Sequence, residues 1–372
     1  MKVLQLGKFY PIQGGVEKVM YELLQGVSGQ GLECDMLCAA LDGGHRVLDI
    51  NENAKLICCH SLAKLAATMI SPDMVVTLKK VCRQYDIIHV HHPDPIACLA
   101  LWMSGFKGKV VLHWHSDILK QKQLLRLYKP LQQWLIKRAD TIVGTTPVYI
   151  RESPYLYKFR NKTCCLPIGI DKMPNMPEKA HAVKDRFQGR KIVFSLGRMV
   201  GYKGFTYLVE AAKYLNNDYV VLIGGTGPLE EDLKLQCSYH GLTDKVKFLG
   251  FVSDEDLPAY YEACDVFCLS SVLKTEAFGI VQIEAMSCAK PVVATRIPHS
   301  GVAWVNMDGV SGINVPPRDP KAIAEAVMQI TKDNETYRRF SLGALKRYNE
   351  NFTKEHMIEN CINIYKNLYD NN

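Results

Sequence analysis

The sequence lacks three features, each of which would assign it to a large class of proteins. No apolar run among its 372 residues reaches the roughly 18 that a membrane-spanning helix needs. The start, MKVLQLGKFY, lacks the long apolar stretch and cleavage site of a secretory signal. The glycine-rich turn GGTGP lacks the form GxxxxGK(S/T), which excludes a P-loop at that point. We therefore expect a cytoplasmic protein with no spanning helix.

The cysteines lack the pattern of a disulfide framework. There are 13, an odd number, scattered along the chain with CxxxC spacings at Cys34/Cys38 and Cys264/Cys268. Several stand inside apolar runs such as LICCH and DVFCLS. Reduced thiols buried in a core are the simplest interpretation.

The bulk composition is that of a soluble globular protein, with 48% apolar and 22% charged residues, and the length suits two domains. The positive charge is unevenly distributed. Residues 1–170 carry 21 Lys and Arg against 13 Asp and Glu, whereas residues 171–372 carry 24 against 25. An anionic surface or substrate facing the first half is the expected consequence.

Apolar strand-like runs alternate with helical segments along the whole chain, which predicts parallel sheets covered by helices on both faces. The pattern restarts at Lys191, after the polar segment Asp171 to Arg190, which we interpret as a linker. The predicted fold class is therefore α/β, with Rossmann-like domains at 1–170 and 171–352 that face each other across a cleft. The predicted strands are KVLQLG, DMLCA, KLICC, DIIHV, KVVLHW, DTIVGTT, CCLPIGI, KIVFSLG, YVVLIGG, VKFLG, DVFCLS and PVVAT.

The loops that follow strands carry the residues with chemical potential. Gly14 and Gly15 precede a predicted helix whose N-terminus is a potential phosphate site, although a plain turn is an equally good reading. Arg198 and Lys203 lie in one such loop, where two cations can clamp a diphosphate or be merely solvated. Gly227 belongs to a tight turn at which backbone can approach a ligand.

Two glutamates flank the start of another predicted helix. Glu276 falls in the loop, and Glu284 falls inside the helix among apolar neighbours, where an inward carboxylate needs a partner such as a sugar or ribose hydroxyl. The amides at the helix start are candidates for holding a phosphate. They belong to Phe278, Gly279, Ile280 and Val281. Together these loops fit one ligand, a nucleoside diphosphate that bears a polar group such as a sugar.

These residues resemble the GT4 family of retaining glycosyltransferases, which have the GT-B fold. The resemblance covers nearly the whole chain. In detail, the sequence is similar to bacterial enzymes of O-antigen and capsular polysaccharide synthesis. Its elements, in order, are PxxGGxE at 11–17, HWHSD at 113–117, GRx4KG at 197–204, GxGP at 225–228 and Ex7E at 276–284. The sequence departs from the family at 296–306, where RIPHSGVAWVN replaces a glycine-rich turn, so sugar specificity is the least predictable property.

The resemblance implies roles for the domains and for the site. The nucleotide-sugar donor is expected mainly on the C-terminal domain and the acceptor mainly on the N-terminal domain, onto which a last helix at about 353–372 packs back. Glu284 is expected to contact the ribose and Glu276 the donor sugar. Arg198 and Lys203 are expected to neutralise the leaving diphosphate, with help from the amides of Gly14, Gly15 and 278–281. His115 is expected near the donor sugar, and no metal or other cofactor is expected.

Two histidine pairs test that expectation, because an HxH pair on a strand points both rings to one face and can bind a metal. They are His89 with His91 and His113 with His115. The later strand ends offer Arg, Lys, Gly and Glu, which suit phosphate rather than further metal ligation. We therefore expect His115 to act in the site and the other three to pack or form hydrogen bonds, with Asp117 positioning the loop.

The segment 118–139 is basic and amphipathic. Its cations are Lys120, Lys122, Arg126, Lys129, Lys137 and Arg138. The stripe Leu124, Tyr128, Leu131 and Leu135 is expected to pack on the sheet, leaving Leu125 and Trp134 outside it. Such a helix can lie on an anionic membrane, which favours a peripheral position on the inner membrane face and a lipid-linked saccharide acceptor. A solvated outer helix is the alternative, and no nucleic-acid motif is apparent.

The predicted function is hexose transfer from a UDP- or GDP-sugar to a lipid-linked or polysaccharide acceptor. Two alternatives stay open at this point. One is a nucleotide-sugar epimerase, which has the same fold. The other is a non-catalytic sugar-nucleotide-binding partner of a polysaccharide assembly complex, which would be expected to lack His115, Arg198, Lys203 or Glu276, and none of these is lost. Motifs do not determine the base, the sugar, the acceptor or the linkage, because pocket shape does.

Overall fold

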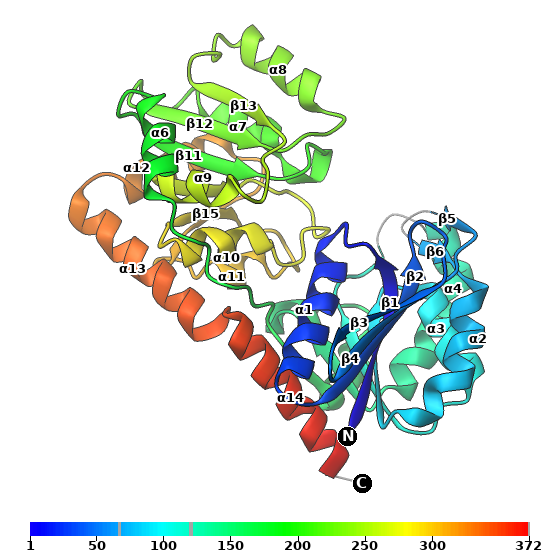
Figure 1. The fold of residues 1–372 in the computed structure, drawn as a ribbon. Helices are drawn as coiled ribbons and strands as arrows, with labels where there is room; N and C mark the ends of the chain where they lie inside the picture. Colours follow the sequence, from blue (N-terminus) through cyan, green and yellow to red (C-terminus); the bar gives the residue numbers. More distant parts are fainter. Residues whose placement is uncertain (66–67, 119–121, 371–372) are drawn as a thin grey trace. The chain divides into compact units, whose positions relative to one another are not determined.

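The computed structural model describes residues 1–65, 68–118 and 122–370 of the chain, in two compact units (Figure 1). The first unit is Met1–Gly169 together with Lys354–Asn372, and the second unit is Ile170–Thr353. Each contains a single large, mainly parallel sheet covered by helices, so the α/β prediction is confirmed.

The first unit contains a sheet of order β10-β9-β8-β7-β1-β2-β4-β3, parallel except for the β3/β4 pair. Its strands are β1 Lys2–Tyr10, β2 Glu33–Ala40, β3 Arg46–Asn51, β4 Ala54–Cys59, β7 Ile87–His92, β8 Lys109–Trp114, β9 Thr141–Gly144 and β10 Thr163–Cys165. A separate hairpin consists of β5 Ala63–Leu65 and β6 Thr68–Ile70.

The edges of this sheet differ from the sequence prediction. Of CCLPIGI only Cys164 and Cys165 belong to a strand, β10, because Pro167 has no N–H to continue the ladder. The antiparallel strand β3 was not predicted. Its residues alternate between half-buried and exposed, a pattern typical of an edge strand with one solvated face.

Helices cover both faces of the first sheet. They are α1 Gly15–Gly29, α2 Pro72–Val81, α3 Pro95–Ser104, α4 Lys122–Arg138, α5 Pro147–Glu152 and α14 Lys354–Asp370, with short 3-10 turns at Cys82–Gln84 and Tyr157–Lys162. In Figure 1, α1 and α14 lie side by side on one face, and α2, α3 and α4 lie together on the other. The last helix thus packs within the first unit, although 184 residues of the second unit precede it.

The second unit contains a fully parallel sheet of order β13-β12-β11-β14-β15-β16. Its strands are β11 Lys191–Leu196, β12 Tyr219–Gly224, β13 Val246–Gly250, β14 Val266–Leu269, β15 Val292–Thr295 and β16 Gly312–Val315. Its helices are α6 Pro177–Asp185, α7 Phe205–Ala211, α8 Glu230–Tyr239, α9 Leu257–Ala263, α10 Ile280–Ser287, α11 Val302–Val305, α12 Pro320–Ile330 and α13 Asn334–Asn351, with a 3-10 turn at Gly201–Lys203.

The interpretation of 171–190 as a linker needs correction. Within it, α6 buries Ala180 and Val183 and packs against α9, so most of this segment belongs to the second unit. Its polar, proline-bearing composition reflects a short helix with a single apolar face and Pro at its start.

All 13 cysteines are free, and ten of them are buried, as the core-thiol interpretation requires. Among the described residues, no helix is both long and apolar enough to cross a membrane.

A close contact joins α1 to α14 in the first unit. A side-chain carbon added at Gly26 would lie only 2.0 Å from the Cδ1 atom of Ile358, whereas one added at Gly29, in the same helix, meets nothing within 4 Å. The absence of a side chain at Gly26 therefore sets the distance between the two helices.

We expect Gly26→Val to lower the free energy of unfolding by about 1–3 kcal/mol, because the added methyl groups overpack this contact. The matched control Gly29→Val should change it by less than about 0.5 kcal/mol. Urea unfolding of both variants measures the difference, and equal effects would mean that α1 and α14 do not pack this tightly.

Candidate active site

The loops after β11 and β14 of the second unit assemble an ion pair. Because the two strands are parallel neighbours, their carboxyl ends meet at one edge of the sheet. The Nζ atom of Lys203 lies 2.6 Å from Oε2 of Glu276, and each side chain is only 12% exposed. Burial alone would lower the pKa of Lys203, but the adjacent Glu276 carboxylate outweighs it and raises that pKa. Lys203 is therefore a permanent cation.

Backbone contacts hold this pair in place. Gly204 has a φ of +67°, and a side chain there would collide with the carbonyl of Ser270 at 2.1 Å, so only glycine allows the loop to reach β14. Ser270 Oγ donates to the Lys203 carbonyl at 3.0 Å, and Ser271 Oγ donates to Glu276 Oε2 at 2.9 Å. The predicted residues Lys203 and Glu276 are thus brought together by two serines that sequence reasoning missed.

Arg198 is exposed at the start of the same loop. The turn that contains Gly227 packs directly on this loop, because a side chain at Gly227 would lie 2.6 Å from the Met199 carbonyl. The Met199 amide also donates to the carbonyl of Thr226 at 2.9 Å. The tight turn thus has a structural cause, close contact between two loops, beside its predicted contact with a ligand.

Glu284 has the buried partner that its position required. Tyr261, on α9, donates from its hydroxyl to Glu284 Oε2 at 2.6 Å, and the glutamate is 8% exposed. This tyrosine was not predicted, and its position in a helix of mixed composition gave no signal. Glu284 lies on α10, and this hydrogen bond orients its carboxylate.

The N-terminus of α10 begins at the expected place. Gly279 is its N-cap with a φ of 78°, and α10 extends over Ile280–Ser287. Phe278 is buried, whereas Ile280 and Val281 are half-buried. The turn that departs from the family pattern lies beside this loop, since Ser300 Oγ donates to the Glu276 carbonyl and the Gly301 amide to that of Ala277.

In the first unit, Gly14 is the extended N-cap of α1, and Gly15 is its first residue. The buried carboxylate of Glu17 folds back toward this terminus, with Oε2 only 2.6 Å from where a side-chain carbon of Gly14 would stand. The anion nearest to this helix N-terminus is therefore the protein's own, and a phosphate there would have to share the site with it.

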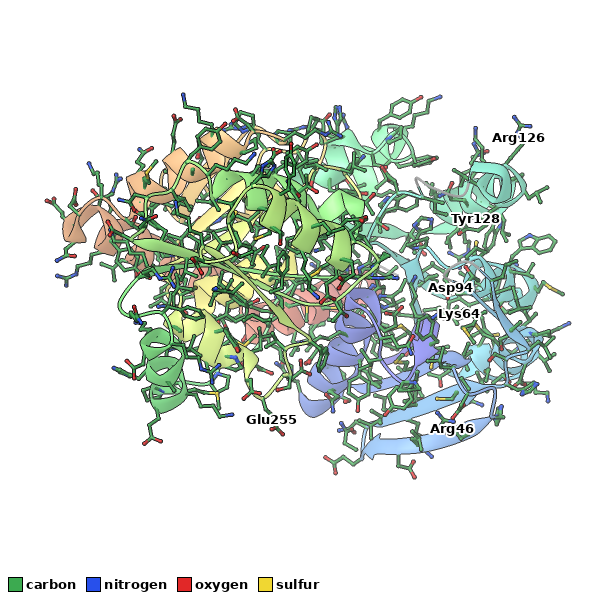
Figure 2. The ribbon with its side chains drawn as sticks, turned by 90° about the horizontal axis from the view of Figure 1, so that it is seen from above. Arg46, Lys64, Asp94, Arg126, Tyr128 and Glu255 are labelled. Carbon is green, nitrogen blue, oxygen red and sulfur yellow. The ribbon has the colours of Figure 1, made fainter. Side chains whose placement is uncertain are left out.

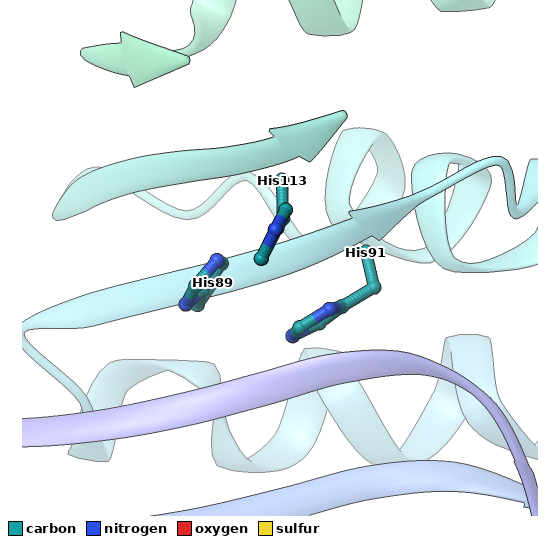
Figure 3. Close-up of side chains that lie close together, drawn as sticks. All are labelled: His89, His91 and His113. Carbon is teal, nitrogen blue, oxygen red and sulfur yellow. The ribbon is translucent and has the colours of Figure 1, made fainter. Parts of the chain in front are cut away.

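The histidines form a buried row on β7 and β8, on one face of the sheet. His91 and His113 are register partners, and Figure 3 shows them with His89. His91 Nδ1 lies 2.9 Å from His115 Nε2, and His89 Nδ1 lies 2.5 Å from the Tyr365 hydroxyl of α14. His113 has no hydrogen-bond partner among the described residues.

The ring nitrogens of His89, His91 and His113 come within 4.8 Å of one another, which raises the question of a metal. The rings are nearly parallel, at 21° for His89/His91 and 14° for His89/His113. A metal lies in the plane of each ligand ring, roughly 2.0–2.1 Å from its nitrogen, so stacked parallel rings do not converge on one ion. Within the described part of the chain, no carboxylate joins these three to offset a buried dication. The row, as arranged, suits hydrogen bonding and stacking.

Burial lowers the pKa of all these histidines. The pKa falls to about 3 for His113, and well below 6.5 for His89, His91 and His115. All of them are therefore neutral at pH 7. Asp117 anchors the end of β8, as its Oδ1 accepts from Trp114 Nε1 at 2.9 Å and from Ser153 Oγ at 2.8 Å.

Helix α4 differs from the expected membrane face in three respects. Arg138 is committed to the fold, because it pairs with Asp140 at 3.1 Å and donates to the carbonyl of Gly108. Leu125 and Trp134 are half-buried, and the exposed apolar residue is Leu127, at 81%.

Several other side chains of α4 lie as the sequence predicted. Arg126 lies on the outside of the helix, whereas Tyr128 lies toward the body of the unit (Figure 2). Lys129 and Lys137 are exposed, and Leu135 is buried as expected. Lys120 and the side chains of Lys122 and Leu124 lie outside the described residues.

A pocket of about 370 Å³ opens between α4, α3 and the β5/β6 hairpin. Among the residues that the structure describes, its one charged lining residue is Lys8, whose Nζ donates to the Pro93 carbonyl at 2.6 Å. The other lining residues are mainly aliphatic, among them Leu99, Leu125 and Leu131. The pocket follows the carboxyl ends of β1 and β7, the edge at which ligands of parallel sheets bind.

With the fold and the site described, comparison with known proteins assigns the chain to a class. The family model described as "Glycosyltransferase Family 4" matches residues 13–172, and the model "Glycosyl transferases group 1" matches residues 177–347. The chain belongs to this family of glycosyltransferases.

Two relatives extend over almost the entire chain. O-antigen chain mannosyltransferase C of Escherichia coli is 32% identical over 373 residues, covering 100% of this chain and 99% of the relative. D-rhamnosyltransferase WbpZ of Pseudomonas aeruginosa is 30% identical over 366 residues, covering 95% and 92%.

Solved structures share the fold at lower identity. Sucrose-phosphate synthase from Thermosynechococcus elongatus matches with a TM-score of 0.79 at 21% identity, covering 100% of both chains. Anabaena HepE in complex with UDP matches with a TM-score of 0.78 at 18% identity, covering 99% of this chain and 100% of that one. The chain thus has the GT-B fold of two Rossmann-like domains that the sequence predicted.

The buried histidines predict a loss of stability in mild acid. Their pKa is lowered in the folded state, so below about 6.5 the unfolded chain takes up protons that the folded chain does not. Each buried histidine should cost about 1 kcal/mol between pH 6.5 and 5.5. His113→Leu removes one titrating ring and no hydrogen bond, so urea unfolding at the two pH values should show a smaller loss than in the wild type by about that amount. An identical pH dependence would mean that His113 is protonated in the folded protein.

Proposed function

We propose that this protein transfers a hexose-type sugar, such as mannose, from a nucleoside diphosphate to a lipid-linked or polysaccharide acceptor in the assembly of a surface polysaccharide. The observation that carries the proposal is the buried Lys203–Glu276 pair at the carboxyl ends of β11 and β14, in a chain of this family. The names of the two relatives, which specify mannosyl and rhamnosyl transfer, support a hexose donor and an O-antigen type of product.

The two charges suit the two halves of a nucleotide sugar. Cleavage of the anomeric C–O bond builds negative charge on the diphosphate and positive charge on the sugar. Lys203 and the exposed Arg198 are the cations for the diphosphate, with the α10 amides of 278–281 beside them. Glu276 is the acceptor for sugar hydroxyls, and Glu284 the acceptor for the ribose.

The ion pair also poses a constraint on the donor. Without donor, the Lys203 ammonium group is paired with the Glu276 carboxylate, at 2.6 Å between Nζ and Oε2. A diphosphate must therefore compete with Glu276 for this cation. A donor that brings hydroxyls to Glu276 and phosphate oxygens to Lys203 satisfies both partners at once. A nucleoside diphosphate without sugar satisfies only one, which favours the intact donor.

We further propose that no divalent cation takes part, because Arg198 and Lys203 occupy the role that a metal has in other transferases. We propose that the anomeric configuration is retained. The acceptor hydroxyl oxygen bonds to the anomeric carbon from the face that the diphosphate leaves, and its proton passes to the departing phosphate oxygen. One glycosidic bond thus forms as the anomeric C–O bond to the diphosphate breaks, and the nucleoside diphosphate leaves with the proton.

The acceptor is assigned to the first unit. The aliphatic pocket beside Lys8 suits the apolar chain of a lipid-linked acceptor, with a cation for its phosphate. The exposed Arg126, Leu127 and Lys129 of α4 suit an anionic membrane surface, on the cytoplasmic face at which such lipids are glycosylated. Two relatives with lipid or O-antigen acceptors in their names support this choice, the second being phosphatidyl-myo-inositol mannosyltransferase of Mycobacterium leprae.

Lys203→Met should lower kcat by about 100-fold or more, because a buried cation facing the leaving group is lost. The assay is transfer from UDP- and GDP-hexoses to a membrane fraction containing lipid-linked saccharide, with and without EDTA, and the anomeric configuration is read by NMR. The control Lys213→Met, an exposed lysine of the same unit, should leave kcat unchanged.

Thermal melting of the same Lys203→Met variant separates loss of catalysis from loss of fold. Turnover at wild-type rate in this variant would remove the leaving-group assignment. Loss of turnover in EDTA would remove the metal-free mechanism, and a sugar nucleotide altered without any acceptor would point to an epimerase.

Leu131→Trp fills the aliphatic pocket and should raise KM for a lipid-linked acceptor about 10-fold, leaving KM for the donor unchanged. The control Leu235→Trp, at a residue 68% exposed on α8, should change neither constant. Steady-state kinetics with a lipid-linked acceptor and with the same saccharide free of lipid measures this. An equal effect of Leu131→Trp on both acceptors would assign the pocket to the saccharide instead.

A further inference from the structure

A continuous chain of hydrogen bonds runs through the core of the first unit from α14 to His115. The Tyr365 hydroxyl accepts from Gln5 Nε2 at 2.8 Å, Gln5 Oε1 lies 2.7 Å from His91 Nε2, and His91 Nδ1 lies 2.9 Å from His115 Nε2. Tyr365, Gln5 and His91 are all fully buried, and His115 is 5% exposed. These residues come from α14, β1, β7 and the end of β8, so the chain joins four elements.

The direction of each hydrogen bond follows from the chemistry of its groups. An amide oxygen only accepts, so His91 must donate to Gln5 from Nε2. A neutral imidazole carries one proton, so Nδ1 of His91 is left as an acceptor. His115 must then donate to it from Nε2. The proton of His115 therefore stands on Nε2, and its Nδ1 is left with a lone pair.

The Gln5 amide lies with Nε2 toward Tyr365 and Oε1 toward His91. The Tyr365 hydroxyl accepts from Gln5 Nε2 and also lies 2.5 Å from His89 Nδ1. The weak contact of Gln5 Nε2 with Cys34 Sγ, at 3.6 Å, lies on the same side. An amide turned by 180° would reverse every donor and acceptor down to His115 and would require the Tyr365 hydroxyl to donate to Gln5 rather than accept from it. The tautomer of His115 is thus coupled to a tyrosine 250 positions later in the sequence.

We propose that Tyr365, Gln5 and His91 are positioning residues that fix His115 in the Nε2-protonated tautomer, so that its Nδ1 accepts a hydrogen bond from a hydroxyl of the sugar substrate. This inference rests on the proposed function for its use of the sugar, but the tautomer itself is a property of the protein alone. Helix α14 then has a chemical as well as a structural role, because its Tyr365 hydroxyl helps to determine which ring nitrogens carry protons.

The tautomer can be observed directly by NMR of protein labelled with ¹⁵N-histidine, since the protonated and bare ring nitrogens have well-separated shifts. In the wild type we expect His115, assigned by its disappearance in His115→Gln, to show a bare Nδ1 and a protonated Nε2. A protonated Nδ1 in the wild type would overturn the proposal.

Gln5→Met keeps the volume but removes the acceptor for His91, and Tyr365→Phe removes only the hydroxyl that orients Gln5. Either change should shift His115 toward protonated Nδ1. The reduction in kcat should follow the population of the active tautomer, from about 2-fold for an even mixture to about 10-fold when one molecule in ten retains it. KM for the donor should change little. A tautomer unchanged in both variants would also overturn the proposal.

Ile362→Val is the matched control, because it perturbs the packing of α14 at a buried residue outside the chain of hydrogen bonds. It should lower the melting temperature without changing the His115 spectrum. The NMR result and the transfer assay fail independently. If the spectrum is as expected but no glycosyl transfer occurs, the proposed function is wrong and the proposed tautomer is confirmed. If transfer occurs but the wild type shows a mixture of tautomers, the proposed function is confirmed and the proposed tautomer is wrong.

Discussion

Parallel pairing of buried strands is the constraint on which the rest of this structure depends. In the sheet of each unit, every strand that carries chemistry runs in the same direction, so the loops that follow them meet at one edge. Lys203 and Glu276 lie 73 positions apart in sequence, yet adjacent parallel strands bring their side chains within 2.6 Å. An antiparallel arrangement would place the two loops at opposite edges.

Burial is the second constraint on the polar groups inside the first unit, because it favours uncharged rings and internal hydrogen bonds, although His113 has no such bond among the described residues. The row of histidines on β7 and β8 faces the helices rather than solvent, where an uncharged ring with an internal partner is tolerated and a charged ring is not. Their neutrality, stacking and shared hydrogen bonds are consequences of that burial. The same residues give the active-site candidate His115 a defined environment before any substrate binds.

Glycines have distinct physical roles in the two units. Gly204 permits a left-handed turn and contact with the backbone of β14, whereas Gly26 permits two helices to approach. Gly227 combines a predicted ligand contact with contact between two loops. A motif glycine therefore does not by itself indicate a ligand, because close backbone contact within the fold selects for glycine just as strongly.

Much of this could be predicted from the sequence. Apolar runs bounded by helices predicted all the central strands of both sheets, because a strand buried on both faces leaves an unbroken apolar signature. The strands β3 and β16 were not predicted; β3 is a half-exposed edge strand, which carries little apolar pattern. On α4, periodicity alone placed Tyr128 and Leu135 inside. It did not predict that Leu125 lines a pocket or that Arg138 donates to the carbonyl of Gly108 in the loop before β8.

By itself the sequence determined the fold class, the family and the residues that stand at the strand ends, because these depend on local pattern and on motif order. Only the tertiary structure decided which of those residues meet. Tyr261 reaches Glu284, and Tyr365 joins Gln5 and His89, and none of these pairs has a local signal. Side-chain partnership between distant segments depends on strand order and helix packing, which act across space and leave no periodicity in the chain.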